Sequence, residues 1–313
     1  MLLPSISKRY IVPNTYHGAM RVLVTGGSGQ LGSYLIEEFS LGHEVRSVDI
    51  RRPAIENHVP FHSHFDIRDE AVRSEVSFAD VIVHAAAQVS VEASLRDPVN
   101  DADINVLGTA NLLKASAESG LKLFVYVSSA AVYGDPVRLP VNEDHPTGPK
   151  SFYGVSKLSA ENYVRAAKEC YGLDYFIVRP FNFYSPRADR RSPYSGVITK
   201  FTEVAKEGGT MLIEGDGGQT RDFIHARDVA RMIRMAVESD ARNVTVNCGS
   251  GRGTSINELA DTLVRLTGGK ARKEHVAPRV GDIRHSVADV SVSKKLLGFA
   301  PQTTLEEGLR SFL

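Results

Sequence analysis

A glycine-rich turn between an apolar strand and a helix is the feature that most constrains the fold of this chain. Residues 24–32 read VTGGSGQLG, so Gly27, Gly29 and Gly32 have GxGxxG spacing. The turn follows a short apolar strand at 22–24 and precedes apolar residues at helical spacing. Because glycine has no side chain, the backbone can turn tightly and approach a pyrophosphate held by the amides of a helix N-terminus. The segment therefore predicts a dinucleotide-binding unit at the front of the chain.

Strand and helix signals alternate as far as residue 180. Strands are expected at 22–24, 44–49, 59–65, 81–85, 121–128 and 175–178, with helices near 99–118 and 153–171. After Pro180, prolines and glycines interrupt this alternation. We expect an α/β fold with a Rossmann-type, doubly wound parallel sheet over 21–180. Residues 181–313 are expected to form mainly a smaller α/β substrate lobe, with some elements returning to the first domain, and residues 1–20 an extension ahead of it.

Composition narrows the class of protein. The 313 residues are 42% hydrophobic, which is enough for a large core, and the 37 basic and 37 acidic side chains cancel. Neutrality gives no reason to expect nucleic acid or a membrane surface as a partner, and no apolar run approaches the ~20 residues that span a bilayer. Two cysteines, Cys170 and Cys248, fit a reducing cytoplasm. No metal site is expected, since no carboxylate or thiol completes a set with the histidines at 58, 62 and 64.

The end of the second strand predicts the type of cofactor. Asp49 stands where a carboxylate accepts both ribose hydroxyls of an adenosine and repels a 2′-phosphate, which favours NAD over NADP. Arg51 and Arg52 weaken this preference, because an arginine there could accept the phosphate.

A tyrosine and a lysine four residues apart supply the candidate chemistry. Tyr153 and Lys157 share one face of a predicted helix, so the ammonium can lie beside the phenol. We expect this charge to lower the pKa of the phenol and make Tyr153 a general base. Ser129, at the end of an apolar strand, lies between the glycine turn and this pair.

Several ordered motifs make the chain, from about Arg21 to its end, resemble the extended short-chain dehydrogenase/reductases. The resemblance is to the NAD-dependent sugar-nucleotide epimerase/dehydratase group and, within it, to members like UDP-glucose 4-epimerase. Its motifs are TGGSGQLG at 25–32, Asp66-Ile67, HAAA at 84–87, NVLGT at 105–109, SSAAVYG at 128–134, Tyr153/Lys157, RPFN at 179–182, GDGGQTRDFIH at 215–225 and RVGD at 279–282.

The resemblance implies roles for the cofactor-binding residues. In this family the glycine turn holds the diphosphate, two residues after the third strand contact adenine, and three after the fourth lie beneath the diphosphate. An asparagine braces the strand that carries the active site. The corresponding residues here are Gly26, Gly29, Gln30, Leu31, Gly32, Asp49, Asp66, Ile67, Ala85, Ala86, Ala87, Asn105, Tyr153 and Lys157.

The resemblance also implies a catalytic set of Ser129, Tyr153 and Lys157. In this set Ser129 hydrogen-bonds the sugar oxygen that Tyr153 deprotonates. Substrate contacts are implied at Ser129, Asn182, Arg221, Arg279, Asp282 and Ser286, and residues 192–198 resemble the segment that folds over the nucleotide base. Family members that eliminate water or carbon dioxide carry acidic residues directly after the serine. Ala130 and Ala131 stand there and cannot shuttle a proton, which favours epimerisation.

We therefore expect NAD-dependent epimerisation at C4 of a nucleotide-diphosphate hexose, such as a UDP-hexose or its N-acetyl form, through a transient 4-keto sugar. One alternative is a 4-ketoreductase or dehydrogenase of a nucleotide sugar, and another is a non-catalytic NAD-binding regulator. Ser286 is small where relatives specific for plain hexoses carry a bulkier residue, which predicts room at C2. A homodimer is expected from relatives in which the helices matching 99–118 and 153–171 pair with their copies. Apolar residues at near-helical spacing support this here, namely Ile104, Leu107, Leu112, Val155, Leu158 and Val164.

Overall fold

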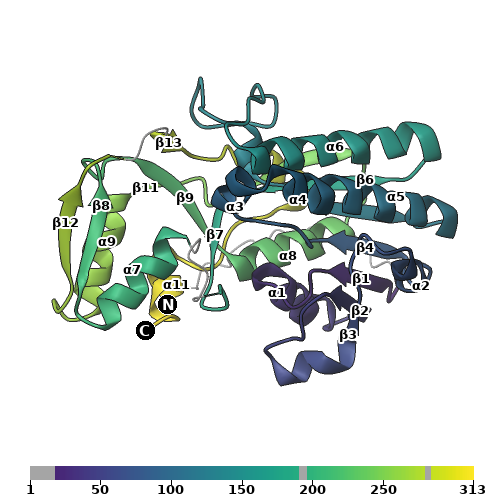
Figure 1. Ribbon diagram of the computed structural model, residues 1–313, viewed down its shortest axis with the longest axis horizontal. Helices are drawn as coiled ribbons and strands as arrows, with labels where there is room; N and C mark the ends of the chain where they lie inside the picture. Colours follow the sequence, from purple (N-terminus) through teal and green to yellow (C-terminus); the bar gives the residue numbers. More distant parts are fainter. Residues whose placement is uncertain (1–17, 190–195, 279–282) are drawn as a thin grey trace, which may run out of the picture.

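A seven-stranded parallel sheet forms the centre of the larger of two lobes (Figure 1). The structure is a computed structural model that describes residues 18–189, 196–278 and 283–313. In sheet order the strands are β10 (Val244–Cys248), β6 (Tyr175–Pro180), β5 (Leu123–Val127), β4 (Val81–His84), β1 (Arg21–Thr25), β2 (Glu44–Asp49) and β3 (His62–His64). Because the order reverses between β1 and β4, their carboxyl ends form the switch point at which such sheets bind ligands.

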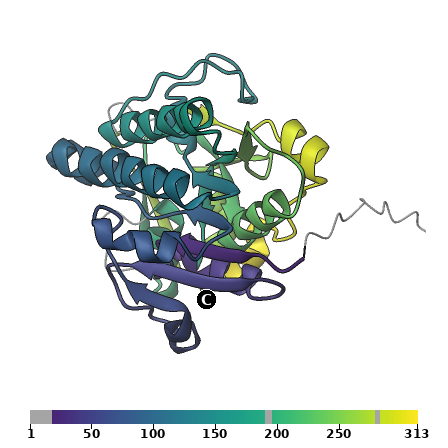
Figure 2. The same ribbon diagram turned by 90° about the vertical axis from the view of Figure 1, so that its right-hand side faces the viewer.

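Helices cover both faces of this sheet. Alternate strand residues point to opposite faces, so Val22 and Val24 pack against α1 (Gln30–Phe39) and α8 (Ala226–Val237). Leu23, between them, packs on the other side with residues of α5 (Gly108–Ser119) and α6 (Phe152–Tyr171). The ribbon views show α5 and α6 side by side at the outer surface (Figures 1 and 2). Two covered faces explain why the central strands are apolar throughout.

The smaller lobe follows β6. One small sheet has the order β11-β9-β13 with β7 also paired to β9, and a second pairs β12 with β8. Its strands are β7 (Asn182–Tyr184), β8 (Thr210–Glu214), β9 (Thr220–His225), β11 (Gly253–Ser255), β12 (Arg272–Val276) and β13 (His285–Ser286). Its helices are α7 (Val197–Lys206), α9 (Ile256–Leu266) and α11 (Leu305–Arg310). By contrast α8, β10 and α10 (Ser291–Leu297) come after residue 180 and contribute to the core of the larger lobe.

Two predicted elements were wrong in detail. Residues 59–65 were expected to be a strand, but Glu56–Phe61 forms a 3₁₀ turn containing Pro60, and only His62–His64 pairs with β2. Proline cannot donate a backbone hydrogen bond to a sheet, which explains the shorter strand.

The helix expected at 99–118 is divided. Pro98 begins α4 (Pro98–Ala102), which passes into a π-helical segment at Asp103–Leu107 before α5. The remaining short elements are α2 (Arg73–Val76), α3 (Val91–Arg96) and 3₁₀ turns at Glu70–Val72 and Ala130–Val132. Among the described residues, no helix is both long enough and apolar enough to span a membrane.

Candidate active site

The glycine turn is packed too closely to accept side chains. Gly26 has φ +74°, and a Cβ placed on it would lie 2.7 Å from the backbone nitrogen of Ala86. A Cβ on Gly32 would lie 2.0 Å from the carbonyl oxygen of Gly26. Gly29 caps α1 without a side-chain hydrogen bond, so first-turn amides remain to bind an anion. The turn therefore has the close backbone approach that a dinucleotide diphosphate requires.

Asp49 lies beside this turn, at the end of β2. Its carboxylate accepts hydrogen bonds from the backbone N–H of Ser28 at 3.1 Å and of Arg51 at 2.8 Å. The Nε of Arg51 lies 3.6 Å from the same carboxylate. Asp49 is thus fixed beside the glycine turn, with one arginine close by.

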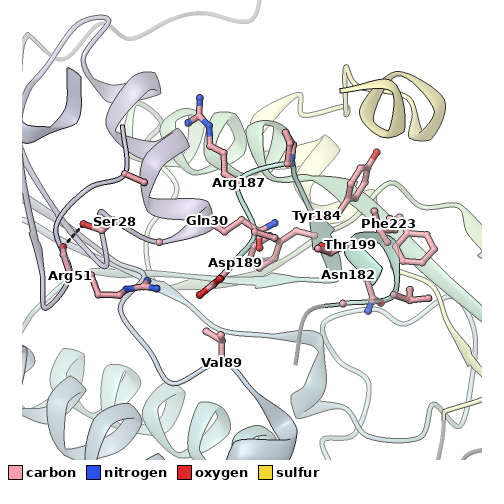
Figure 3. Close-up of a pocket in the computed structure, with 18 of the residues that line it drawn as sticks. Ser28, Gln30, Arg51, Val89, Asn182, Tyr184, Arg187, Asp189, Thr199 and Phe223 are labelled. Atoms are coloured by element: carbon pink, nitrogen blue, oxygen red, sulfur yellow. Dashed lines mark hydrogen bonds between the residues drawn. The ribbon is translucent and has the colours of Figure 1, made fainter. Parts of the chain in front are cut away.

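A cavity of about 800 Å³ lies between the glycine turn and the smaller lobe. Ser28, Gln30 and Arg51 line it on one side, and Asn182 and Phe223 on the other (Figure 3). Among the described residues, those that line it do not include Tyr153 or Lys157. Val89, which also lines it, lies just before α3, where Ser94 Oγ accepts a hydrogen bond from the backbone N–H of Tyr153 on α6 at 3.1 Å.

The three candidate catalytic residues meet where β5 ends and α6 begins. Ser129 precedes the 3₁₀ turn and accepts a hydrogen bond from the Ala131 amide at 3.1 Å. Tyr153 lies in the first turn of α6, where the Ser129 hydroxyl is close enough to affect the pKa of its phenol. Lys157 follows one turn later, is buried, and places its Nζ 4.5 Å from the centre of the Tyr126 ring. A hydroxyl, a phenol and an ammonium therefore face one region.

The expected lowering of the Tyr153 pKa was wrong. Burial raises the pKa of the phenol, and although interaction with the Ser129 hydroxyl lowers it, the carboxylate of Asp101 raises it further. Burial also lowers the pKa of Lys157 to about 7, against the opposing effects of Glu161 and Asp101. Both shifts have one cause, since a buried site penalises the charged forms of both residues.

Asn105 joins the π-helical segment to α6 and to the loop after β4. Its Nδ2 donates to the carbonyl of Gln88 and to Ser156 Oγ, each at 3.0 Å, and its Oδ1 accepts from the Gln88 amide at 2.8 Å. The Thr109 hydroxyl donates to the Asn105 carbonyl at 2.6 Å. Asn105 therefore fixes the position of the helix that carries Tyr153 and Lys157.

Other predicted cofactor residues lie around the switch point. Ala85, Ala86 and Ala87 directly follow β4, and the Ala86 amide donates to Thr25 Oγ1 at 3.2 Å. Asp66 pairs with Arg68 at 2.6 Å, and Ile67 is buried against Gly108 at the start of α5. Gln30 and Leu31 begin α1.

The smaller lobe brings together three predicted substrate residues. Asn182 on β7 is exposed and pairs in register with Phe223 of β9, while Ser286 on β13 pairs in register with Arg221 of β9. Arg279 and Asp282 lie outside the described residues, as do residues 192–195 of the segment predicted to fold over the base. Within the part of the chain that is described, no cluster of histidine, cysteine or acidic side chains could hold a metal ion.

Sequence reasoning missed a buried ion-pair network behind Ser129. Glu161, one turn after Lys157 on α6, accepts from Arg179 Nη2 and Arg165 Nη2, each at 2.7 Å, and from Ser128 Oγ at 2.6 Å. Arg179 also donates to Tyr133 Oη at 2.9 Å. The spacing from Tyr153 to Lys157 to Glu161, four residues at each step, was a signal that could have placed Glu161 on this face.

A parallel sheet with a glycine turn at its switch point and a Ser–Tyr–Lys set beyond it defines a nicotinamide-dependent enzyme of the short-chain dehydrogenase/reductase type. The sequence model of the NAD dependent epimerase/dehydratase family matches residues 22–249. The chain belongs to this family, which confirms the predicted fold class, NAD as cofactor and the enzyme class of nucleotide-sugar epimerases.

Relatives with named activities cover nearly the whole chain. The UDP-glucose 4-epimerase of Mycolicibacterium smegmatis is 34% identical over 303 residues, which is 93% of this chain and 96% of that protein. The structure of the UDP-glucose 4-epimerase of Thermotoga maritima with UDP-glucose has a TM-score of 0.87 at 35% identity, covering 94% and 97% of the two chains. The UDP-N-acetylglucosamine 4-epimerase of Methanobrevibacter ruminantium, in complex with UDP-N-acetylmuramic acid, has a TM-score of 0.87 at 31% identity, covering 95% and 97%.

Proposed function

We propose that this protein epimerises C4 of a UDP-hexose, or of its N-acetylated form, with tightly held NAD and through a transient 4-keto sugar. The observation that carries the proposal is the Ser129 hydroxyl acting on the Tyr153 phenol, one helical turn from Lys157, with alanines at positions 130 and 131. The named activities of the relatives agree with it.

The residues around the switch point fit a dinucleotide. The turn from Gly26 to Gly32 would hold the diphosphate, since added Cβ atoms would fill the space its backbone leaves. Asp49 would accept the adenosine ribose hydroxyls, and Lys157 the nicotinamide ribose. When bound, NAD supplies reversible hydride chemistry at C4 of the sugar.

Tyr153 acts as the base at the sugar 4-hydroxyl. Its phenolate accepts the hydroxyl proton and later returns it, while Ser129 hydrogen-bonds the same oxygen. The raised pKa of the buried phenol favours the return of the proton, and Lys157 as ammonium favours its removal. Ala130 and Ala131 leave no acid or base there for elimination, so the 4-keto sugar is reduced again on its opposite face.

The smaller lobe holds the rest of the substrate. We assign Asn182 and Arg221 to the nucleotide diphosphate, Arg279 and Asp282 to its phosphate and ribose, and Ser286 to the wall beside C2. Arg221 is suited to phosphate because a guanidinium can donate two parallel hydrogen bonds. Binding of the remote diphosphate retains the intermediate while the hexose turns.

A cytoplasmic homodimer formed by the helical face of α4 to α6 completes the proposal. Val99 is 77% exposed, Leu107 59% and Val155 46%, so this face carries large apolar side chains in contact with solvent. Leu112 and Val164, also expected at the interface, are instead buried in the core of their own chain. The two free cysteines fit a reducing compartment.

Incubation with a panel of nucleotide sugars tests the proposal, with product stereochemistry read by proton NMR. Inversion at C4 without net formation of reduced nicotinamide supports it. Stoichiometric change at the reduced-nicotinamide absorbance band would favour the alternative ketoreductase or dehydrogenase. Bound NAD without turnover of any sugar in the panel would favour a regulator.

A further inference from the structure

Asp101 is a buried carboxylate next to the catalytic helix that the proposed reaction does not yet use. It lies in the last turn of α4 and is only 1% exposed. Its Oδ1 accepts from Gln88 Nε2 at 2.7 Å and from Asn105 Nδ2 at 3.3 Å. Its Oδ2 is buried and has no hydrogen-bond partner among the described residues. Burying a carboxylate that has no cation bound directly to it is costly unless a nearby charge compensates for it.

A candidate for that charge is Lys157, whose pKa the charge of Asp101 raises. Asn105 links Asp101 to Ser156 Oγ at 3.0 Å, and Lys157 is the next residue on α6. Lys157 is itself buried, and its Nζ lies over the Tyr126 ring, 4.5 Å from the ring centre, rather than against a carboxylate. A buried ammonium and a buried carboxylate on adjacent helices, neither directly neutralised, reduce each other's desolvation cost.

Glu161 is the other carboxylate close to Lys157, but its charge is already matched. Two guanidinium groups, those of Arg179 and Arg165, donate to its two oxygens. Their positive charge partly offsets the field of Glu161, which still raises the pKa of Lys157. Asp101 has no such arginine among the described residues, so its charge acts on the site without that offset.

We infer that Asp101 is a positioning residue of the active site, which orients Asn105 and supplies the counter-charge to the Lys157 ammonium. Its effect extends to Tyr153, because the same negative charge disfavours the phenolate. The charged and titratable groups on the elements around it are Tyr153, Lys157 and Glu161 of α6, Tyr126 of β5, His84 of β4, Glu92 and Arg96 of α3, and Asp97 and Asp103 beside α4. Glu92 and Arg96 pair with each other, and Asp103 with Arg68.

The inference rests in part on the proposed roles of Tyr153 and Lys157, but its test needs no substrate. The phenolate absorbance of the NAD-bound protein is titrated with pH, and the signal of the matching Tyr153→Phe variant is subtracted. In Asp101→Asn the midpoint for Tyr153 should move about 1 pH unit toward acid. The matched control is Asp103→Asn, which removes a charge of the same sign two residues away from a side chain that is 41% exposed. Solvent screening should leave its midpoint unchanged.

In kinetics, Asp101→Asn should move both limbs of the pH–kcat profile toward acid, since both Tyr153 and Lys157 lose a negative neighbour. A purely structural role would lower the plateau and leave both limbs in place. An unchanged Tyr153 midpoint in folded Asp101→Asn would overturn the inference. If the Tyr153 midpoint shifts in Asp101→Asn but the unsubstituted protein epimerises no sugar, the proposed function is refuted and this inference stands.

If Asp101→Asn folds poorly, a double-mutant cycle of thermal stability tests the inference instead. Thermal melting of Asp101→Ser, Lys157→Met and the double variant measures the coupling between the two charges. Each single variant leaves one buried charge unmatched, so the double variant should melt higher than the sum of the two losses predicts. Additive losses would overturn the counter-charge role.

Discussion

The guanidinium of Arg187 pairs with the carboxylate of Glu37 at 2.6 Å and thereby joins the smaller lobe to α1 of the larger one. Arg187 also donates to Ser33 Oγ at 3.2 Å and lies 3.9 Å from the centre of the Tyr34 ring. It lines the cavity beside the glycine turn (Figure 3). The segment that carries Arg187 is therefore tied to α1 beside this cavity.

We predict that Arg187→Ala weakens NAD retention. Loss of one charged hydrogen bond between the lobes, worth roughly 1.5–3 kcal/mol, corresponds to a dissociation constant at least about tenfold higher. The measurement is the NAD content after gel filtration, with Arg252→Ala, an exposed arginine of the smaller lobe, as the control. If Arg187→Ala retains as much NAD as the unsubstituted protein, Arg187 does not contribute to NAD retention.

Tyr153→Phe should fold, retain NAD and lose activity by about 10²–10⁴-fold, because a general base contributes on that scale. Tyr171→Phe is the matched control, since it removes a hydroxyl from the exposed end of the same helix. Initial rates of sugar epimerisation give the comparison. Normal turnover by Tyr153→Phe would show that Tyr153 is not the general base.

Acid should destabilise the protein through His84. This histidine is buried between Thr25 Oγ1 at 2.7 Å and Thr109 Oγ1 at 3.0 Å, and burial, with the nearby charge of Lys157, lowers its pKa from 6.5 to about 3. Below pH 6.5 the unfolded chain binds a proton at this residue, whereas the folded chain binds it only near pH 3. The free energy of unfolding therefore decreases as the pH is lowered from 6.5 to about 3.

One such group contributes a slope of up to ~1.4 kcal/mol per pH unit to the dependence of the free energy of unfolding on pH. His84→Asn should lose this part of the pH dependence of the free energy of unfolding, measured with urea between pH 4 and 7. His64→Asn, at an exposed position, should keep it. Equal slopes in both variants would show that His84 is not the group that titrates.

Val155→Asp should produce a monomer if the exposed face of α6 forms a dimer interface, because a carboxylate would be buried against an apolar partner. Light scattering at micromolar concentration gives the mass. Leu212→Asp is the control, because Leu212 is 55% exposed on β8, far along the chain in the smaller lobe. A monomeric mass for the unsubstituted protein would contradict the proposed dimer outright.

Substitution of Ser286 tests the breadth of the sugar site. Ser286→Tyr adds a ring beside C2 and should selectively disfavour N-acetylated sugars by about 1–3 kcal/mol in transition-state binding. The ratio of kcat/KM for the plain and N-acetylated UDP-hexoses is the relevant quantity. An equal effect on both substrates would show that Ser286 does not face C2.

Local signals in the sequence were sufficient for most of the larger lobe. The strand expected at 44–49 matches β2, because its residues alternate in the way a strand requires. The helix expected at 153–171 begins one residue early as α6, whose first turn is capped by Ser151. Which polar side chains are buried was harder to predict from the sequence. Asp101 precedes Asn105 by one helical turn, but nothing in its spacing shows that α4 turns it inward. Likewise, Arg187 contacts Glu37 from 150 residues away, and only the packing of the two lobes brings them together.

The fate of the hydrogen at C4 tests the central claim most directly. A UDP-hexose labelled with deuterium at C4 is incubated with the NAD-loaded protein in ordinary water, and the product is analysed by NMR. Epimerisation by removal and return of one hydride predicts inversion at C4 with the deuterium retained there and no net reduced nicotinamide. Inversion with the label lost to solvent, or oxidation without inversion, would contradict the account.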